Sequence, residues 1–238
     1  MYKTVSEARA LARALRSKCG ALDDRDIVVC PPFTALPAVA QELQGSAILW
    51  GGQNAHWERE GAFTGEVAAW MLADLGCRYV IVGHSERRQC FQETDATVNR
   101  RMHGALAAGL IPIVCIGETL QERETGTTFA VLEKQMRESL AGLTPASTVV
   151  AAYEPVWAIG TGQTATPAQA QEVHAWIRKR YGQVYGDSAA QALRILYGGS
   201  VKPDNVKALL QQPDIDGGLV GGASLDAESF AKIVRYNL

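Results

Sequence analysis

The chain has 238 residues, of which 47% are hydrophobic and 20% are charged, and its formal net charge is −2. This is the composition of a globular protein with one large domain or two small ones. A nearly neutral chain has no general attraction to nucleic acid or to an anionic membrane surface, and no apolar run is long enough to span a bilayer. Neither nucleic acid nor a membrane is therefore expected as a partner.

Cysteine usage points to a reducing compartment. The five cysteines form no Cys-x-x-Cys pair, and their odd number does not suit a closed disulfide framework. No other metal-ligand spacing is present. The sequence therefore predicts a cytoplasmic protein without a metal site.

Short apolar runs alternate with amphipathic segments along the chain. The first element is a helix, where Thr4 and Glu7 have the spacing of a capping box. Seven buried strands are predicted at residues 27–30, 47–50, 79–82, 111–116, 149–153, 192–197 and 217–220. Eight helices are predicted at about residues 4–18, 35–43, 66–75, 95–108, 127–141, 167–181, 203–210 and 225–236.

Strands that are apolar on both faces and separated by helices are typical of a parallel sheet with helical crossovers. Seven strands and eight helices predict an α/β fold, a (β/α)8 barrel that lacks its first β-strand, in a single domain over residues 1–238. A doubly wound sheet would need a glycine-rich phosphate fingerprint after the first strand, where this chain has Pro31 and Pro32.

Glu154 comes directly after the fifth strand, and Pro155 ends that strand because proline has no N–H to donate. A loop with Gly160 and Gly162 follows, and Thr166 then begins the next helix. A carboxylate under an apolar loop that can close is a candidate general base. The alternative is an ionised glutamate in a surface turn, which is the commoner place for a charged residue.

Other polar or glycine clusters also come just after strands, and in a parallel barrel these loops open on one face. His84 begins a helical turn, where backbone N–H groups pointing at the imidazole would disfavour its cationic form. It would then be a neutral donor to a substrate carbonyl, the alternative being a histidine in a polar loop. Gly198-Gly199-Ser200 and Gly221-Gly222 indicate a phosphate site, although each glycine pair alone also fits a tight turn.

These residues lie in segments that closely resemble the triosephosphate isomerase family. The resemblance covers essentially the whole chain. The matching motifs are Val82-Gly83-His84-Ser85-Glu86-Arg87-Arg88, Ala152-Tyr153-Glu154-Pro155-Val156-Trp157-Ala158-Ile159-Gly160-Thr161-Gly162, Tyr197-Gly198-Gly199-Ser200-Val201 and Val220-Gly221-Gly222-Ala223-Ser224-Leu225.

The resemblance implies a TIM barrel that interconverts dihydroxyacetone phosphate and glyceraldehyde 3-phosphate without a metal or cofactor. It implies that Glu154 is the base and His84 the group that polarises the carbonyl. The implied phosphate-binding residues are Gly160, Ser200, Gly221 and Gly222. The implied supporting residues are Ser85, Glu86 and Cys115. The implied lid is Val156, Trp157, Ala158, Ile159, Gly160, Thr161 and Gly162, continuing to Thr166.

The chain departs from the family at its start, because the first strand with its Asn-x-Lys motif does not precede Met1. Losing two substrate-binding groups predicts a strongly reduced activity for residues 1–238. The loop from His56 to Gly65 resembles the family's dimer loop, with Thr64 near its tip, so a homodimer is expected, weakened by the missing asparagine.

Three interpretations stay open from the sequence. The first is a triosephosphate isomerase whose printed sequence lacks its amino-terminal strand. The second is a folded, nearly inactive relative that acts as a binding or structural protein. The third is another phosphate-binding barrel enzyme, which the lid and the Gly-His-Ser-Glu-Arg-Arg motif disfavour because both match one family.

Overall fold

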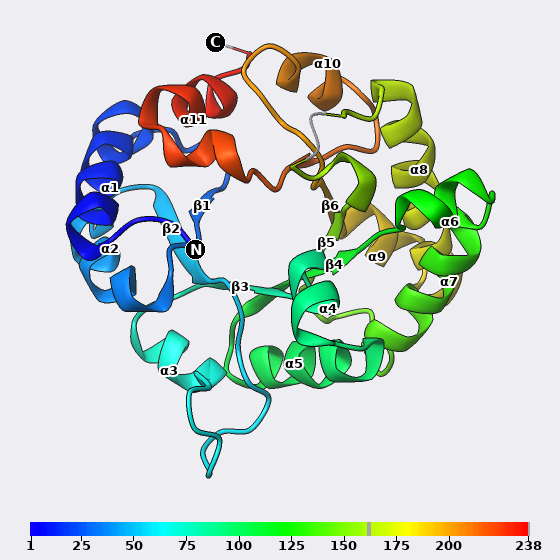
Figure 1. Cartoon of the computed structure of the whole chain (residues 1–238), viewed down its shortest axis with the longest axis horizontal. Helices are drawn as coiled ribbons and strands as arrows, with labels where there is room; N and C mark the ends of the chain where they lie inside the picture. Colours follow the sequence, from blue (N-terminus) through cyan, green and yellow to red (C-terminus); the bar gives the residue numbers. More distant parts are fainter. Residues whose placement is uncertain (161–162, 238) are drawn as a thin grey trace.

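The computed structural model of this chain describes residues 1–160 and 163–237. Within those residues, seven parallel strands form one sheet whose spatial order follows the chain from β1 to β7. The strands are β1 (Ile27–Val29), β2 (Ile48–Gly52), β3 (Tyr79–Val82), β4 (Ile111–Ile116), β5 (Val150–Tyr153), β6 (Arg194–Tyr197) and β7 (Gly217–Gly218). The sheet curls into an incomplete ring with helices around its outside (Figure 1). The prediction of a seven-stranded barrel is confirmed.

Helices connect successive strands on the outside of the ring. The α-helices are α1 (Val5–Cys19), α2 (Leu36–Leu43), α3 (Ala69–Asp74), α4 (Ser85–Phe91), α5 (Asp95–Ala107), α6 (Leu120–Glu124), α7 (Thr128–Ser139), α8 (Pro167–Tyr185), α9 (Asp187–Ala192), α10 (Val206–Leu210) and α11 (Ala227–Val234). Short 3-10 helices are η1 (Phe33–Ala35), η2 (Val156–Ala158) and η3 (Gly222–Leu225).

The predicted number of eight helices is wrong for the described residues, because the structure has eleven α-helices. The three additional helices are α4, α6 and α9, each of seven residues or fewer. Helices this short bury too little apolar surface to show a clear periodicity in the sequence. Two of them begin at a side-chain cap instead: His84 caps α4, and at α6 Thr119 and Glu122 form a reciprocal capping box.

Threonine caps also fix where longer helices begin. The predicted box of Thr4 with Glu7 at α1 is present, and at α8 Thr166, where a helix start was predicted, forms a box with Gln169. At the start of α5, Thr94 and Thr97 bond in the same reciprocal way. Each box satisfies N–H groups that the first helical turn leaves without a partner.

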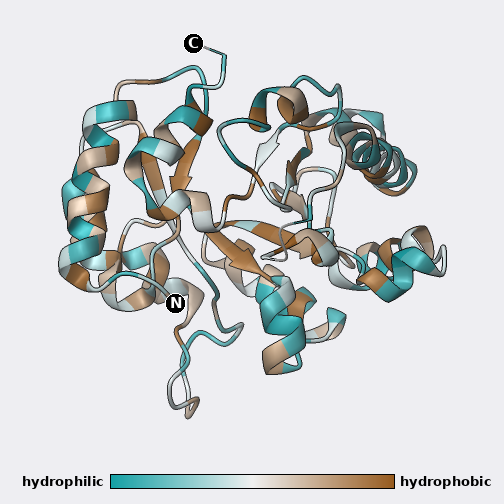
Figure 2. Ribbon diagram, turned by 45° about the horizontal axis from the view of Figure 1, so that its top comes forward, coloured by the Kyte–Doolittle hydropathy of each residue, from teal (hydrophilic) through white to brown (hydrophobic). Residues whose placement is uncertain are grey.

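Apolar side chains fill both sides of the sheet. The larger core lies between the strands and the outer helices, and a smaller cluster inside the ring includes Ile81, Ile113, Cys115, Val150 and Ala152. The strands accordingly form the hydrophobic centre of the molecule (Figure 2). Because all seven strands are parallel, the loops that follow them meet at one edge of the ring.

The two outermost strands each have one neighbour among the described residues. β1 pairs with β2, and β7 pairs with β6, so one edge of each faces the gap in the ring. Both strands are short, with three and two residues. Across residues 1–160 and 163–237, no helix combines the length and apolar composition needed to cross a bilayer.

Candidate active site

Glu154 lies at the carboxyl end of β5 and is buried, with only 2% of its surface exposed. Its backbone N–H donates to the Ile116 carbonyl at 2.8 Å, which extends the β4–β5 pairing by one residue. One carboxylate oxygen, Oε2, accepts from the Ser85 backbone N–H at 2.9 Å. The predicted surface-turn alternative for Glu154 is therefore wrong.

His84 is the N-cap of α4, directly after β3. Its Nε2 lies 2.9 Å from Glu154 Oε1, although the contact does not have the alignment of a hydrogen bond. Its Nδ1 accepts from the Glu86 backbone N–H at 3.3 Å, an arrangement that assigns the proton of the neutral ring to Nε2. The Nε2 atom of His84 therefore lies beside the carboxylate of Glu154.

Opposing influences act on the pKa of His84. Burial lowers the pKa, whereas the carboxylate of Glu154 and, more weakly, that of Glu86 raise it, and the net pKa lies above the ordinary value. The prediction that the cationic form is disfavoured is wrong for this arrangement. That prediction took account only of the N–H groups at the start of the helix. The folded chain also places the Glu154 carboxylate, from the end of β5, beside the ring.

Two glycines make room for Glu154. A Cβ at Gly117 would lie 1.7 Å from the Glu154 carbonyl oxygen, and a Cβ at Gly198 would lie 2.8 Å from Glu154 Cγ. Cys115 lies on the inner face of β4 and is fully buried. Burial, and then the neighbouring Glu154 carboxylate, raise the pKa of the Cys115 thiol, so the residue packs as a neutral group.

Glu118 is a buried carboxylate at the site that was not predicted from the sequence. Its Oε1 accepts from the Tyr153 hydroxyl at 3.1 Å, from Trp157 Nε1 at 3.0 Å and from Arg123 at 3.2 Å. Because Trp157 belongs to the predicted lid, Glu118 anchors one end of that segment to β4 and β5. The signal available in the sequence was its position near a strand end, since Glu118 is the second residue after β4 and Glu154 is the first after β5.

The predicted lid begins as the 3-10 helix η2, with Val156 half-buried and Ala158 buried. After Ile159, Gly160 is exposed and has a φ of +69°, a conformation that favours glycine. Thr161 and Gly162 lie outside the described residues.

Three of the predicted phosphate-binding residues follow β6 and β7. Ser200 is half-buried after β6, and its carbonyl accepts from Asn205 Nδ2 at 2.9 Å. Gly221 and Gly222 are exposed after β7, at the start of η3. Since β7 pairs with β6 and β6 with β5, these loops lie along the same edge of the sheet as Glu154. Their exposed backbone leaves space for an anion.

Among the described residues, no group of three or more His, Cys, Asp or Glu side chains is placed to hold a metal ion. The polar groups that converge at the end of the sheet are a buried carboxylate, an imidazole and glycine-rich loops. A parallel barrel with this arrangement at the carboxyl ends of its strands has the architecture of a barrel enzyme that acts by proton transfer.

Comparisons with known proteins identify the family. The family model described as Triosephosphate isomerase matches residues 1–237. The chain is 59% identical to the triosephosphate isomerase of Endomicrobium trichonymphae over 239 aligned positions, which cover 100% of this chain and 95% of the relative. The triosephosphate isomerase of Moorella thermoacetica gives the same identity and coverage.

A crystal structure of triosephosphate isomerase from Bartonella henselae superposes with a TM-score of 0.90 at 40% identity, covering 99% of this chain and 94% of that one. The chain therefore belongs to the triosephosphate isomerase family, as its motifs predicted, and so to the isomerases.

Proposed function

We propose that this chain interconverts dihydroxyacetone phosphate and glyceraldehyde 3-phosphate. Glu154 removes a proton from the carbon next to the substrate carbonyl, and His84 donates a hydrogen bond from Nε2 to the carbonyl oxygen. The enediolate then takes the proton back from Glu154 at the neighbouring carbon, while the proton of the substrate hydroxyl moves to the former carbonyl oxygen, so atoms and charge balance without a redox step. The observation that supports this proposal best is the 2.9 Å approach of His84 Nε2 to Glu154 Oε1.

The remaining residues bind the substrate and exclude water. The phosphate binds at Gly160, Ser200, Gly221 and Gly222, while Ser85 orients the Glu154 carboxylate through its backbone N–H. The lid closes over the substrate and removes water from around the base, which strengthens its interactions with the reacting carbon. A substrate carbonyl between His84 and Glu154 separates the two groups, and the influence of Glu154 that raises the His84 pKa then decreases.

The activity of residues 1–238 is expected to be strongly reduced, because the Asn-x-Lys motif of the family is not among them. A preorganised side chain that stabilises the developing charge, such as the asparagine or the lysine of that motif, typically raises the catalytic rate by a factor of about 10² to 10³.

We further propose that the chain forms a homodimer through the loop from His56 to Gly65 and acts in the cytoplasm. All five cysteines are free, as in proteins of reducing compartments. Recovery of the native protein outside the cytoplasmic fraction would contradict that location.

A coupled isomerase assay tests the assignment of the base. Glu154→Gln is expected to lower kcat/KM by at least about 10³-fold, because the amide cannot accept the proton. Glu133→Gln is the matched control, since Glu133 pairs with Arg180 at the surface of α7 and α8. An unchanged rate in Glu154→Gln would overturn the role of Glu154. Binding of a phosphorylated triose without turnover would favour the nearly inactive relative instead.

A further inference from the structure

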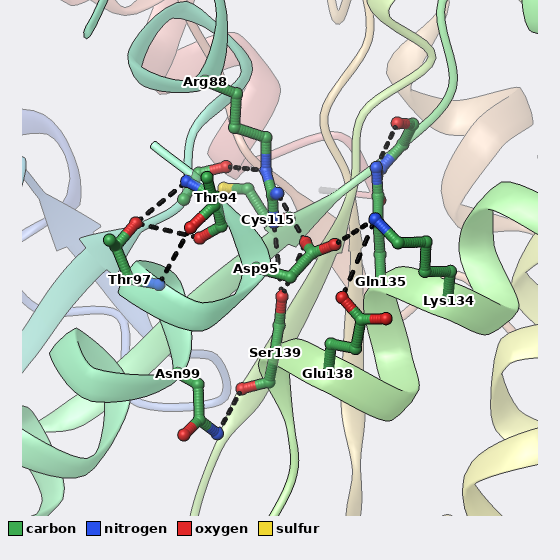
Figure 3. A network of polar contacts seen from close by, with 12 residues as sticks. Arg88, Thr94, Asp95, Thr97, Asn99, Cys115, Lys134, Gln135, Glu138 and Ser139 are labelled. Carbon is green, nitrogen blue, oxygen red and sulfur yellow. Dashed lines mark hydrogen bonds and ion pairs between the residues drawn. The ribbon is translucent and has the colours of Figure 1, made fainter. Parts of the chain in front are cut away.

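Arg88, on the short helix α4, uses all three of its guanidinium nitrogens. Its Nε donates to the Gly83 carbonyl at 2.8 Å, and one terminal nitrogen donates to Asp95 Oδ1 at 2.6 Å. The other terminal nitrogen donates to the Cys115 carbonyl at 3.2 Å and lies 3.4 Å from Ser139 Oγ. Figure 3 shows Arg88 between Asp95, Cys115 and Ser139. The guanidinium therefore joins α4 to α5, α7 and the carboxyl ends of two strands.

The first of these contacts acts on His84. The Gly83 carbonyl belongs to the peptide group that carries the His84 N–H, so a bond to this oxygen fixes the orientation of the His84 backbone. Gly83 has a φ of +70°, and an added Cβ would lie 2.7 Å from Val98 Cγ2. The chain turns sharply at this point, and the Arg88 side chain holds the turn.

The second contact acts on the strand next to Glu154. Cys115 pairs with Ala152 in the β4–β5 register, and the next residue, Ile116, accepts from the Glu154 N–H. The Cys115 side chain is buried against the Glu154 carboxylate. Arg88 therefore reaches the strand that supports Glu154 and the turn that supports His84 with one planar group.

Asp95 holds the guanidinium in this orientation. Its side chain is buried, with 7% exposed, and its Oδ1 also accepts from Ser139 Oγ at 3.0 Å. The ammonium group of Lys134 lies 3.6 Å from Asp95 Oδ2 and comes from α7 (Figure 3). A lysine in place of Arg88 would keep the positive charge but could not reproduce the planar set of donors.

We propose that Arg88 is a positioning residue, which sets the distance and orientation of His84 relative to Glu154 by holding the Gly83 and Cys115 carbonyls together. The proposal rests on the isomerase function proposed above. A misplacement of about 1 Å between reacting groups can cost about 10²-fold in rate, so a rigid link between the two strand ends has a direct effect on catalysis.

Arg88→Lys is the kinetic test, with Arg178→Lys as its matched control. Arg178 likewise donates to backbone carbonyls, those of Ala190, Leu193 and Asp214, and pairs with the Asp214 carboxylate, but it lies outside the candidate site. Arg88→Lys is expected to lower kcat by about 10- to 100-fold with little change in KM. Arg178→Lys is expected to lower thermal stability and leave kcat unchanged. Equal effects of both variants on kcat would overturn the proposal.

A second readout does not depend on turnover. His84 is one of four histidines, so its ring signals can be assigned by NMR from the spectrum of His84→Gln. In Arg88→Lys the pKa of His84 is expected to fall towards its ordinary value, because the Glu154 carboxylate no longer lies against it. Arg178→Lys is expected to leave this pKa unchanged.

Arg88→Met separates position from charge. Loss of a nearby positive charge alone would raise the His84 pKa, whereas loss of the contact with Glu154 lowers it. A fall supports the proposal, and an unchanged or raised His84 pKa in both Arg88 variants overturns it. If the parent chain shows no isomerase activity, the proposed function fails on that result, and the NMR titration still decides whether Arg88 positions His84.

Discussion

At the scale of single residues, His174 is a histidine whose titration the fold changes strongly. It lies on α8, fully buried, with its ring 5.8 Å from that of Tyr153 and 6.4 Å from that of Tyr197. Its Nδ1 lies 3.1 Å from the Asp214 carbonyl, with which it bonds as a neutral donor. Burial lowers the pKa of His174 to about 4, so the folded protein keeps this ring neutral over most of the acidic range.

This pKa shift predicts a loss of stability at acid pH. Between the ordinary value of about 6.5 and about 4, the unfolded chain binds a proton at this position that the folded chain does not. The contribution of His174 to the free energy of unfolding therefore falls by about 2 kcal/mol from pH 7 to pH 5. His174→Phe removes this contribution, and urea unfolding at the two pH values is expected to show a smaller decrease than in the parent. An identical decrease would contradict the prediction.

Some residues of the candidate site were predicted from the sequence and others were not, and the contacts of each residue explain the difference. Glu154 and His84 stand out in the sequence because each follows an apolar strand and matches a motif. Glu118 and Arg88 matter through partners that lie far away in sequence, such as Cys115, which is 27 residues from Arg88. No local sequence pattern predicts the contact between Arg88 and Cys115, because the two residues come together only when β3 and β4 pair.

At the scale of elements, continuous apolar runs were located accurately. The predicted ranges of β3 and β4 agree with the structure to the residue, because buried parallel strands are apolar on both faces. Strand β7 was predicted to reach Val220 but pairs only over Gly217–Gly218, where one neighbouring strand supports it. Helix α3 was predicted from Glu66 but starts at Ala69, because Ala68 forms a bridge with His56 and the Val67 carbonyl accepts from the His56 N–H.

The segment from His56 to Gly65 projects from the body of the molecule, next to α3 (Figure 1). Its base is ordered by the ring of His56, which stacks on Trp57 at 4.1 Å and lies tilted against Phe63 at 4.3 Å. Phe63 is nevertheless 43% exposed, and Met71 on α3 is 55% exposed. Apolar side chains on an ordered projection are typical of a protein interface.

Sedimentation velocity tests the homodimer that we propose. The parent chain is expected to sediment at about twice its mass of 25.6 kDa, with dissociation on dilution if the interface is weak. Phe63→Asp is expected to shift the population to monomer, because the charge cannot be buried without a partner. Val184→Asp, at a 58% exposed position on α8, is the control and should leave the distribution unchanged. A parent chain that stays monomeric at every concentration would refute the proposal.

At the scale of the whole molecule, the open sheet leads to a test of the reduced activity. Residues 1–238 extended at the amino end by a strand with an Asn-x-Lys motif are expected to show at least about 10³-fold higher kcat/KM than residues 1–238. The strand would also pair with the free edges of β1 and β7, so the thermal midpoint should rise.

An extension of the same length separates these two effects. With alanine in place of the asparagine and the lysine, it is expected to raise the thermal midpoint without the gain in rate. Similar rates for all three proteins in the coupled assay would rule out an essential part for the motif.

The threonine caps at Thr4, Thr94, Thr119 and Thr166 bear on how such a molecule can change over evolutionary time. Each helix start is specified by two residues three apart, independently of the loop that precedes it. A loop after a strand can therefore be lengthened or replaced without moving the beginning of the next helix. The loops that carry the catalytic and binding residues can therefore diverge, while the helices and strands keep their positions in the sequence pattern.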